Sequence, residues 1–136
     1  MQDNHSRSVK GTLRGLHYQL ESPQGKLVRV LNGRVLDVAV DLRKSSPCFG
    51  QHVSVELSEE SHRMLWVPPG FAHGFVVLSE RADFLYKCTA YYSPQDERAI
   101  RWDDPNLAID WKLESEPMLS DRDKQASSFD EAKVFL

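Results

Sequence analysis

The amino-acid sequence predicts an all-β protein, with the strands arranged as a β-sandwich or jelly roll. Apolar and polar residues alternate with a period of two along most of the chain. Turns rich in glycine, proline, asparagine and serine separate the alternating segments, and little of the chain favours helix. The 136 residues suit a single domain spanning 1–136, and 27% charged with 40% hydrophobic residues is typical of a globular protein.

The expected strands are short and follow one another with brief connections. They span residues 11–20, 26–31, 34–42, 51–57, 63–67, 73–78, 82–92 and 99–102. Asn32-Gly33 lies between two apolar segments and is the strongest short hairpin signal in the chain. The polar residues 1–5 lie outside every expected strand, and residues 127–136 are expected to add a short helix. About eight short strands of this kind are typical of a jelly roll.

Composition and charge exclude several classes of function. The net charge is −3 and no block of lysine or arginine occurs, so we expect no nucleic-acid partner. The longest apolar runs, such as 75–78, are too short to cross a bilayer, and the first ten residues do not resemble a signal peptide. Cys48 and Cys88 form no CxxC pair, which favours two reduced thiols in the cytoplasm.

Alternation along the strand at 34–42 separates its side chains onto two faces. Leu36, Val38 and Val40 share an apolar face, whereas Asp37 and Asp41 point the other way. Small and polar side chains on one face suit the mouth of a barrel that leaves room for a ligand.

The strand at 11–20, which reads LRGLHYQ in its centre, carries an arginine and a histidine among apolar residues. Alternation predicts that Leu13, Gly15, His17 and Gln19 share one side. Arg14 is then expected on the opposite side, unless Gly15 occupies a β-bulge, as glycines within strands often do.

Taken one at a time, these polar residues also suit purely structural roles. A strand histidine such as His17 is more often a hydrogen-bonded structural residue, and Tyr86 is by default a core aromatic. Metal-binding β-barrels often place two histidines one residue apart, but His17 is followed by Tyr18-Gln19 and only His73 could approach it. Two such ligands hold a metal poorly, so we expect no metal ion.

Seven motifs in order along the chain carry a resemblance to a known family. They read QDNHS, LRGLHYQ, QGKLVRV, DVAVDLRKSSPCFG, LWVPPGFAHGF, FLYKCTAYYSPQDE and IRWDDPNLAIDW. They follow one another from residue 2 to residue 111, and the whole chain resembles the dTDP-4-dehydrorhamnose 3,5-epimerase family. The resemblance implies a cupin-type jelly roll without metal or cofactor, a cytoplasmic homodimer, and a dTDP-4-dehydro-6-deoxyhexose as substrate. Members of the family usually have further strands before QDNHS, so we expect a domain that lacks those N-terminal strands.

The resemblance also implies roles for individual residues. His17 matches the catalytic base, and Asp123 matches the carboxylate that orients its imidazole. Lys26 matches the lysine beside the C4 oxygen of the sugar, and Tyr86 matches the acid on the opposite face of the ring. The remaining matched positions are substrate contacts: Gln2, Asp3, Asn4, Arg14 for the diphosphate, His73, Tyr92 for stacking on thymine, Glu97, and Arg122 where members often have lysine.

The chemistry of epimerisation explains why these residue types are needed. Inverting a carbon beside a ketone requires a base, an enolate held by a cation or donors, and an acid on the far face. Because one-sided chemistry could dispense with the opposite acid, the presence of both His17 and Tyr86 favours a 3,5-epimerase. A mono-epimerase, a ketoisomerase or a non-catalytic sugar-nucleotide-binding cupin are the alternatives.

Overall fold

The computed structural model describes residues 1–136 and consists almost entirely of strands. No helix is long and apolar enough to cross a membrane. The only helix, α1, spans Asp121–Lys124, and Ser120 caps its first turn by accepting a hydrogen bond from the amide of Asp123 at 3.2 Å. The strands are β1 (Gln2–Val9), β2 (Leu13–Gln19), β3 (Lys26–Asn32), β4 (Arg34–Asp41), β5 (His52–Ser58), β6 (Met64–Val67), β7 (Phe71–Val77), β8 (Arg81–Cys88) and β9 (Glu97–Ala99).

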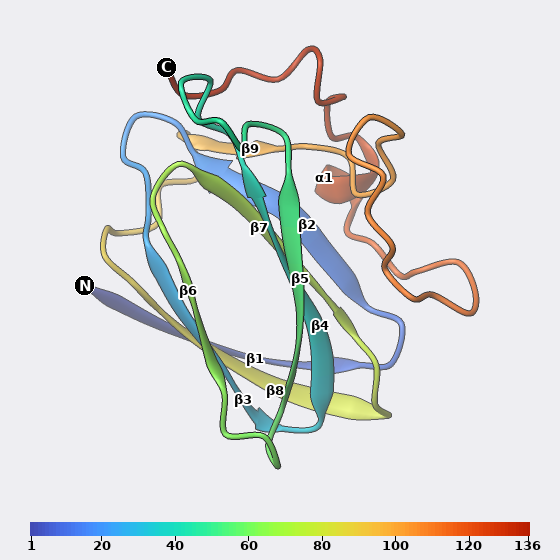
Figure 1. Ribbon diagram of the computed structural model, residues 1–136. Coiled ribbons are helices and arrows are strands. Elements are labelled where there is room, and N and C mark those ends of the chain that lie inside the picture. Colours follow the sequence, from blue (N-terminus) through green and yellow to red (C-terminus); the bar gives the residue numbers. More distant parts are fainter.

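The strands form two antiparallel sheets that face each other, which confirms the predicted jelly roll (Figure 1). One sheet has the order β1-β8-β3-β6, and the other has the order β5-β4-β7-β2-β9. Consecutive strands therefore often lie in different sheets. This arrangement places residues that are distant in sequence on the two walls of one interior.

Two separate apolar clusters stabilise the fold. One lies between the sheets and includes Val28, Val35, Phe75 and Phe84. The other covers the outer face of the five-stranded sheet, where Leu36, Val38 and Val40 of β4 pack, as alternation predicts. Asp37 points away from this second cluster, so β4 is buried on both faces.

The C-terminal segment covers the outer face of the five-stranded sheet. Figure 1 shows its orange to red path running beside α1, β2 and β9, away from β1, β3 and β8. Isolated parallel bridges fasten it to the sheet region at Thr12↔Met118, Ile100↔Ser127 and Arg43↔Phe135. Phe129 and Phe135 pack against the apolar cluster beneath it.

Three sequence-based expectations are wrong. Asn32-Gly33 is not a hairpin, because β3 and β4 lie in different sheets and Gly33 turns the corner between them with a φ of +85°. Residues 127–136 form no helix, since their aromatic side chains and bridges hold them flat against the sheet. Gln2–Val9 forms a full strand, β1, paired along its length with β8.

The predicted bulge in β2 is present and changes which side chains share a face. The pairing of β2 with β7 shifts register between Arg14 and His17, and Gly15 has a φ of +128°. A Cβ on Gly15 would lie 2.6 Å from the Cα of Gly74, so the two backbones approach too closely for a larger residue. As a result Arg14 and His17 line the same cavity, whereas Leu13 packs in the opposite apolar cluster.

Candidate active site

A cavity of about 270 Å³ lies between the two sheets and has polar side chains from both. His17 and His73 reach it from β2 and β7 of the five-stranded sheet. Lys26 and Tyr86 reach it from β3 and β8 of the four-stranded sheet. A ligand held here would therefore have an imidazole on one side and a phenol with an ammonium on the other.

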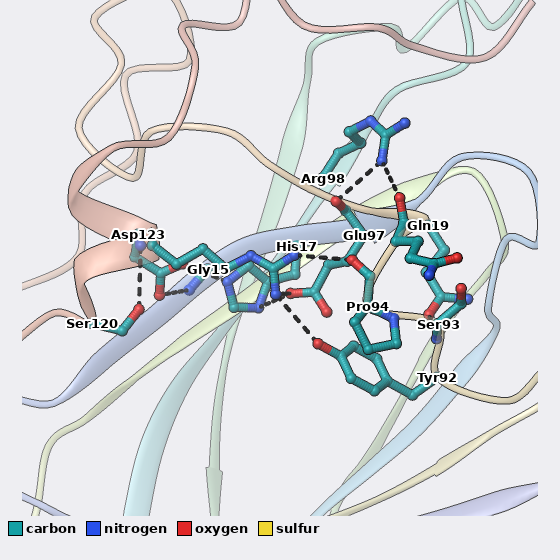
Figure 2. A network of polar contacts seen from close by, with 12 residues as sticks. Gly15, His17, Gln19, Tyr92, Ser93, Pro94, Glu97, Arg98, Ser120 and Asp123 are labelled. Atoms are coloured by element: carbon teal, nitrogen blue, oxygen red, sulfur yellow. Dashed lines mark hydrogen bonds and ion pairs between the residues drawn. The ribbon is translucent and has the colours of Figure 1, made fainter.

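The imidazole of His17 is held by a carboxylate from the C-terminal segment. Nε2 of His17 lies 2.5 Å from Oδ1 of Asp123, and the amide of Gly15 donates to Oδ2 of Asp123 at 3.1 Å (Figure 2). Burial opposes ionisation of Asp123, but the hydrogen bonds from His17 and Gly15 outweigh it and keep its pKa below the usual range. The charged carboxylate fixes the ring orientation and stabilises an imidazolium.

A second carboxylate faces the other nitrogen of the same ring. Figure 2 shows His17 between Asp123 and Glu97, with Oε1 of Glu97 3.7 Å from Nδ1 of His17. This separation is too long for a hydrogen bond. Because Asp123 occupies Nε2, Nδ1 is the ring nitrogen that remains free to accept a proton. The side chain of His17 is 27% exposed, so this nitrogen can be reached by a ligand.

Lys26 is a buried cation without a protein counter-charge. Its residue is 9% exposed, and its ammonium makes no ion pair or side-chain hydrogen bond, lying only over the ring of Tyr86 at 5.5 Å from the centroid. Burial lowers the pKa of Lys26, although Cys88, Glu97 and Asp37 partly oppose this. The donors of the ammonium are therefore available to an oxygen atom in the cavity.

Tyr86 keeps its proton over a wide pH range. Burial, with smaller contributions from Cys88 and Glu97, raises the pKa of the phenol to about 12. The hydroxyl is thus fully protonated at neutral pH and can serve as a proton donor.

His73 belongs to a second, fully buried pair. Nε2 of His73 lies 2.7 Å from Oδ1 of Asp37, and Asp37 is 0% exposed. The other oxygen, Oδ2 of Asp37, has no hydrogen-bond partner. Sequence reasoning left Asp37 outside the site, although a carboxylate amid the apolar residues of β4 signals a buried polar partner.

The segment after β8 brings Tyr92 to the mouth of the cavity. Gln2 accepts a hydrogen bond from the amide of Tyr92 at 2.7 Å, and Gln19 accepts one from the amide of Ser93 at 2.7 Å. Gln24 donates to the carbonyl of Ala90 at 2.8 Å. These amide side chains fix the backbone of the segment and thereby keep Tyr92 beside the cavity.

The structure brings most of the sequence-predicted site residues together. The residues that line the cavity are Asn4, Arg14, His17, Lys26, His73, Tyr86, Tyr92 and Glu97. Asp123 lies behind His17, Gln2 holds the Tyr92 backbone, and Arg122 contacts Tyr92 and Glu97. Asp3 is not among them, because alternation along β1 turns it outward, where it pairs with Lys87 at 3.0 Å. Sequence reasoning missed Gln24, Phe75, Phe84 and Cys88, which also line the cavity.

A jelly roll with an imidazole, a phenol and an ammonium around an inter-sheet cavity has the architecture of a cupin-type isomerase. A family model described as dTDP-4-dehydrorhamnose 3,5-epimerase matches residues 1–131. The chain is 58% identical over 135 residues to the dTDP-4-dehydrorhamnose 3,5-epimerase of Pseudomonas aeruginosa, covering 99% of this chain and 75% of that protein. The chain belongs to the dTDP-4-dehydrorhamnose 3,5-epimerase family.

Solved structures agree with this assignment. The dTDP-6-deoxy-D-glucose-3,5-epimerase of Legionella pneumophila, solved with dTDP-4-keto-L-rhamnose, superimposes with a TM-score of 0.96 at 57% identity. The match covers 98% of this chain and 71% of that one. A 3'-monoepimerase from Streptomyces bikiniensis, solved with dTDP-quinovose, gives a TM-score of 0.88 at 37% identity, covering 93% of this chain and 65% of that one.

Proposed function

We propose that this chain epimerises dTDP-4-dehydro-6-deoxy-D-glucose at C3 and C5, giving dTDP-4-dehydro-L-rhamnose. The observation that carries the proposal is the placement of His17 and Tyr86 on opposite sheets around one cavity, with Lys26 beside Tyr86. Family membership at high identity supports the substrate class.

Proton removal is the role of His17. Nδ1 takes the proton from the carbon next to the C4 ketone, while Asp123 holds Nε2–H and stabilises the imidazolium that forms. The electron pair of the C–H bond moves into the ring and places negative charge on the C4 oxygen. Lys26, buried, unpaired and facing the cavity, stabilises that charge.

Proton delivery from the other face completes each inversion. Tyr86 donates its hydroxyl proton to the enolate carbon, which is a stronger base than a phenolate. Because the pKa of Tyr86 is raised to about 12, the hydroxyl keeps its proton until the enolate forms. The His17 imidazolium then releases its proton and the Tyr86 phenolate takes one up from water, and the same sequence repeated at the other carbon, C3 and then C5, gives the double epimer.

The rest of the cavity provides contacts for the sugar nucleotide. Arg14 is the cation suited to the diphosphate, because its guanidinium can bind two phosphate oxygens at once. Tyr92 presents a half-exposed ring at the mouth, where it can stack on thymine. Asn4 and His73 supply donors and acceptors for sugar hydroxyls.

Incubation with dTDP-4-dehydro-6-deoxy-D-glucose in deuterium oxide tests the proposal directly. We expect NMR to show deuterium at both C3 and C5 together with conversion to the L-rhamno product. Deuterium at one carbon only would instead identify a mono-epimerase. The similarity to a 3'-monoepimerase makes that second function a real alternative, since the same scaffold carries single epimerisation in that relative. Binding without any exchange would refute both.

Substitution of Tyr86 by phenylalanine is expected to separate inversion from exchange. Net inversion should fall by roughly 10²-fold, because the acid on the far face is lost. Exchange should fall much less, since His17 can still remove a proton and return a deuteron to the same face. NMR measures both rates in one sample. Tyr91→Phe, at a residue that is 72% exposed and does not line the cavity, is the matched control. Equal losses of inversion and exchange would remove Tyr86 from the role of acid.

The outer face of the four-stranded sheet supports a homodimer in the cytoplasm. It carries Leu27, Leu31, Met64, Trp66 and Leu85, with Arg29 among them. Met64 is 57%, Trp66 50% and Leu31 39% exposed, and Trp66 lies directly opposite Leu27 in the register of β3 and β6. A second copy of the chain would cover these side chains. Two free thiols, Cys48 and Cys88, suit the reducing cytoplasm.

We expect light scattering to give the mass of a dimer at micromolar concentration. The substitution Trp66→Lys should shift the protein to a monomer, because it places a charge in the apolar face. Val53→Lys, at an equally exposed apolar position on the other sheet, should leave the dimer intact. A stable monomer of the unaltered chain, or a dimer that tolerates Trp66→Lys, would contradict this arrangement.

A further inference from the structure

The guanidinium of Arg122 connects the mouth of the cavity with the surroundings of the His17 imidazole. Nη1 donates to the hydroxyl of Tyr92 at 3.2 Å and lies 3.3 Å from Oε1 of Glu97, while Nη2 donates to the carbonyl of Pro94 at 3.3 Å. Glu97 in turn faces Nδ1 of His17 (Figure 2). One side chain therefore touches the aromatic ring assigned to the nucleobase and the carboxylate beside the base.

The position of Glu97 decides whether Nδ1 of His17 is free. If the carboxylate of Glu97 moved within hydrogen-bond distance of Nδ1, the ring would lie between two carboxylates that both stabilise its protonated form. A ring that is already protonated cannot accept a proton from the substrate. Glu97 stays at 3.7 Å from Nδ1 while its Oε1 lies 3.3 Å from Arg122. The contact with Arg122 thus keeps the carboxylate of Glu97 beyond hydrogen-bond distance of Nδ1.

We propose that Arg122 is a positioning residue: it restrains Glu97 so that Nδ1 of His17 stays available, and it ties this restraint to the position of Tyr92. The inference rests on the proposed role of His17 as the base. A nucleobase stacked on Tyr92 would fix the hydroxyl to which Arg122 donates, so nucleotide binding would favour the arrangement in which the base is free.

In this chain the contacts at position 122 use the shape of arginine. A planar guanidinium offers five N–H donors in fixed directions, and here they reach a phenol, a carboxylate and a backbone carbonyl at once. A lysine ammonium is a single point of charge on a flexible stem and could not hold all three partners. The Tyr92 backbone is held separately by Gln2 and its neighbour Ser93 by Gln19, so loss of Arg122 leaves the segment in place.

The test is a set of variants measured by kcat, KM and the pH dependence of kcat. Arg122→Met should lower kcat by roughly 10-fold or more and shift the acidic limb of the kcat profile to higher pH, because a released Glu97 stabilises the imidazolium. Adding Glu97→Gln should abolish that shift. Arg122→Lys should restore kcat only in part. Arg98→Met should match wild type, since Arg98 donates only to the backbone carbonyls of Gln95 and Glu97.

Several charged or titratable groups near His17 can influence the pH dependence of kcat. The titratable and charged groups around His17 are Arg14 on β2, Asp123 and Arg122 on α1, Glu97 on β9, His73 on β7, Asp37 on β4, Lys26 on β3, Tyr86 and Cys88 on β8, and Tyr92 in the segment after β8. A shift of the profile that disappears with Glu97→Gln can therefore be assigned to the contact between Arg122 and Glu97.

Tyr92→Phe tests the coupling between Tyr92 and Arg122: its effect on kcat should vanish in the Arg122→Met background.

Three results would overturn the proposal. They are an unchanged pH profile in Arg122→Met, a shift that persists after Glu97→Gln, and effects of Arg122→Met and Tyr92→Phe on kcat that simply multiply. Failure of the proposed function looks different, because the unaltered chain would then show no exchange at C3 or C5, or His17→Asn would retain the exchange of the unaltered chain. Thermal unfolding of each variant separates loss of structure from loss of positioning.

Discussion

His17→Asn is expected to lower deuterium exchange at both C3 and C5 by roughly 10³-fold or more. Asparagine is smaller but polar, and its side-chain amide can still donate a hydrogen bond to Asp123. Asp123 is only 2% exposed, so its carboxylate would otherwise lose its main partner. It cannot accept a proton at neutral pH. The expected loss therefore reports the chemistry of the imidazole rather than the stability of the site.

The same variant also tests whether a single base serves both carbons. Binding of dTDP, measured by calorimetry, should be unchanged, because His17 faces the sugar rather than the nucleotide in the proposed complex. Exchange that persists at one carbon in His17→Asn would mean that another group in the cavity, such as Glu97 or His73, removes that proton.

Lys26→Met is expected to lower kcat by roughly 10²–10³-fold, the usual cost of removing a group that stabilises an oxyanion. Methionine retains much of the apolar stem but has no charge to place beside the C4 oxygen. The stability of the variant should equal or exceed that of wild type, because a buried ammonium without a counter-charge destabilises the fold. Lys87→Met on β8, where the lysine is exposed and paired with Asp3, is the control for both measurements. Unchanged turnover in Lys26→Met would remove the residue from the site of the enolate.

The pH profile gives an independent reading of Lys26. Burial lowers its pKa, so the ammonium loses its proton below its ordinary range, whereas Tyr86 keeps its proton to about 12. The active form is the charged ammonium, so activity should fall on the alkaline side as Lys26 deprotonates. Lys26→Arg should move this limb upward, since a guanidinium keeps its charge. A limb that does not move would assign it to another group.

Alternation was a good guide to the strands because most of them bury one apolar face. It failed for Gln2–Val9, whose half-buried positions are polar: Gln2 and Asn4 face the active-site region rather than a core. It also failed for the pairing of strands. Asn32-Gly33 has the composition of a hairpin turn, but the choice between a hairpin and a corner depends on which sheet the next strand joins.

In the site, too, features set by neighbouring residues could be predicted, whereas contacts between residues distant in sequence could not. The glycine in LRGLHYQ allowed a bulge to be anticipated, and the bulge is what brings Arg14 and His17 to one side. The partner of His17 could not be found locally, because Asp123 lies 106 residues further along the chain and only the resemblance connected them. The pairing of His73 with Asp37 and the bridging position of Arg122 depend on packing between strands and segments, which no local pattern encodes.

A crystal structure with dTDP-4-dehydro-6-deoxy-D-glucose bound to the His17→Asn variant tests the central claim most directly. We predict that the hexose lies in the cavity between β2 and β8, with position 17 on one face of the ring, the Tyr86 hydroxyl on the other, and the Lys26 ammonium within hydrogen-bond distance of the C4 oxygen. A hexose with both residues on the same face, or bound outside this cavity, would contradict the account.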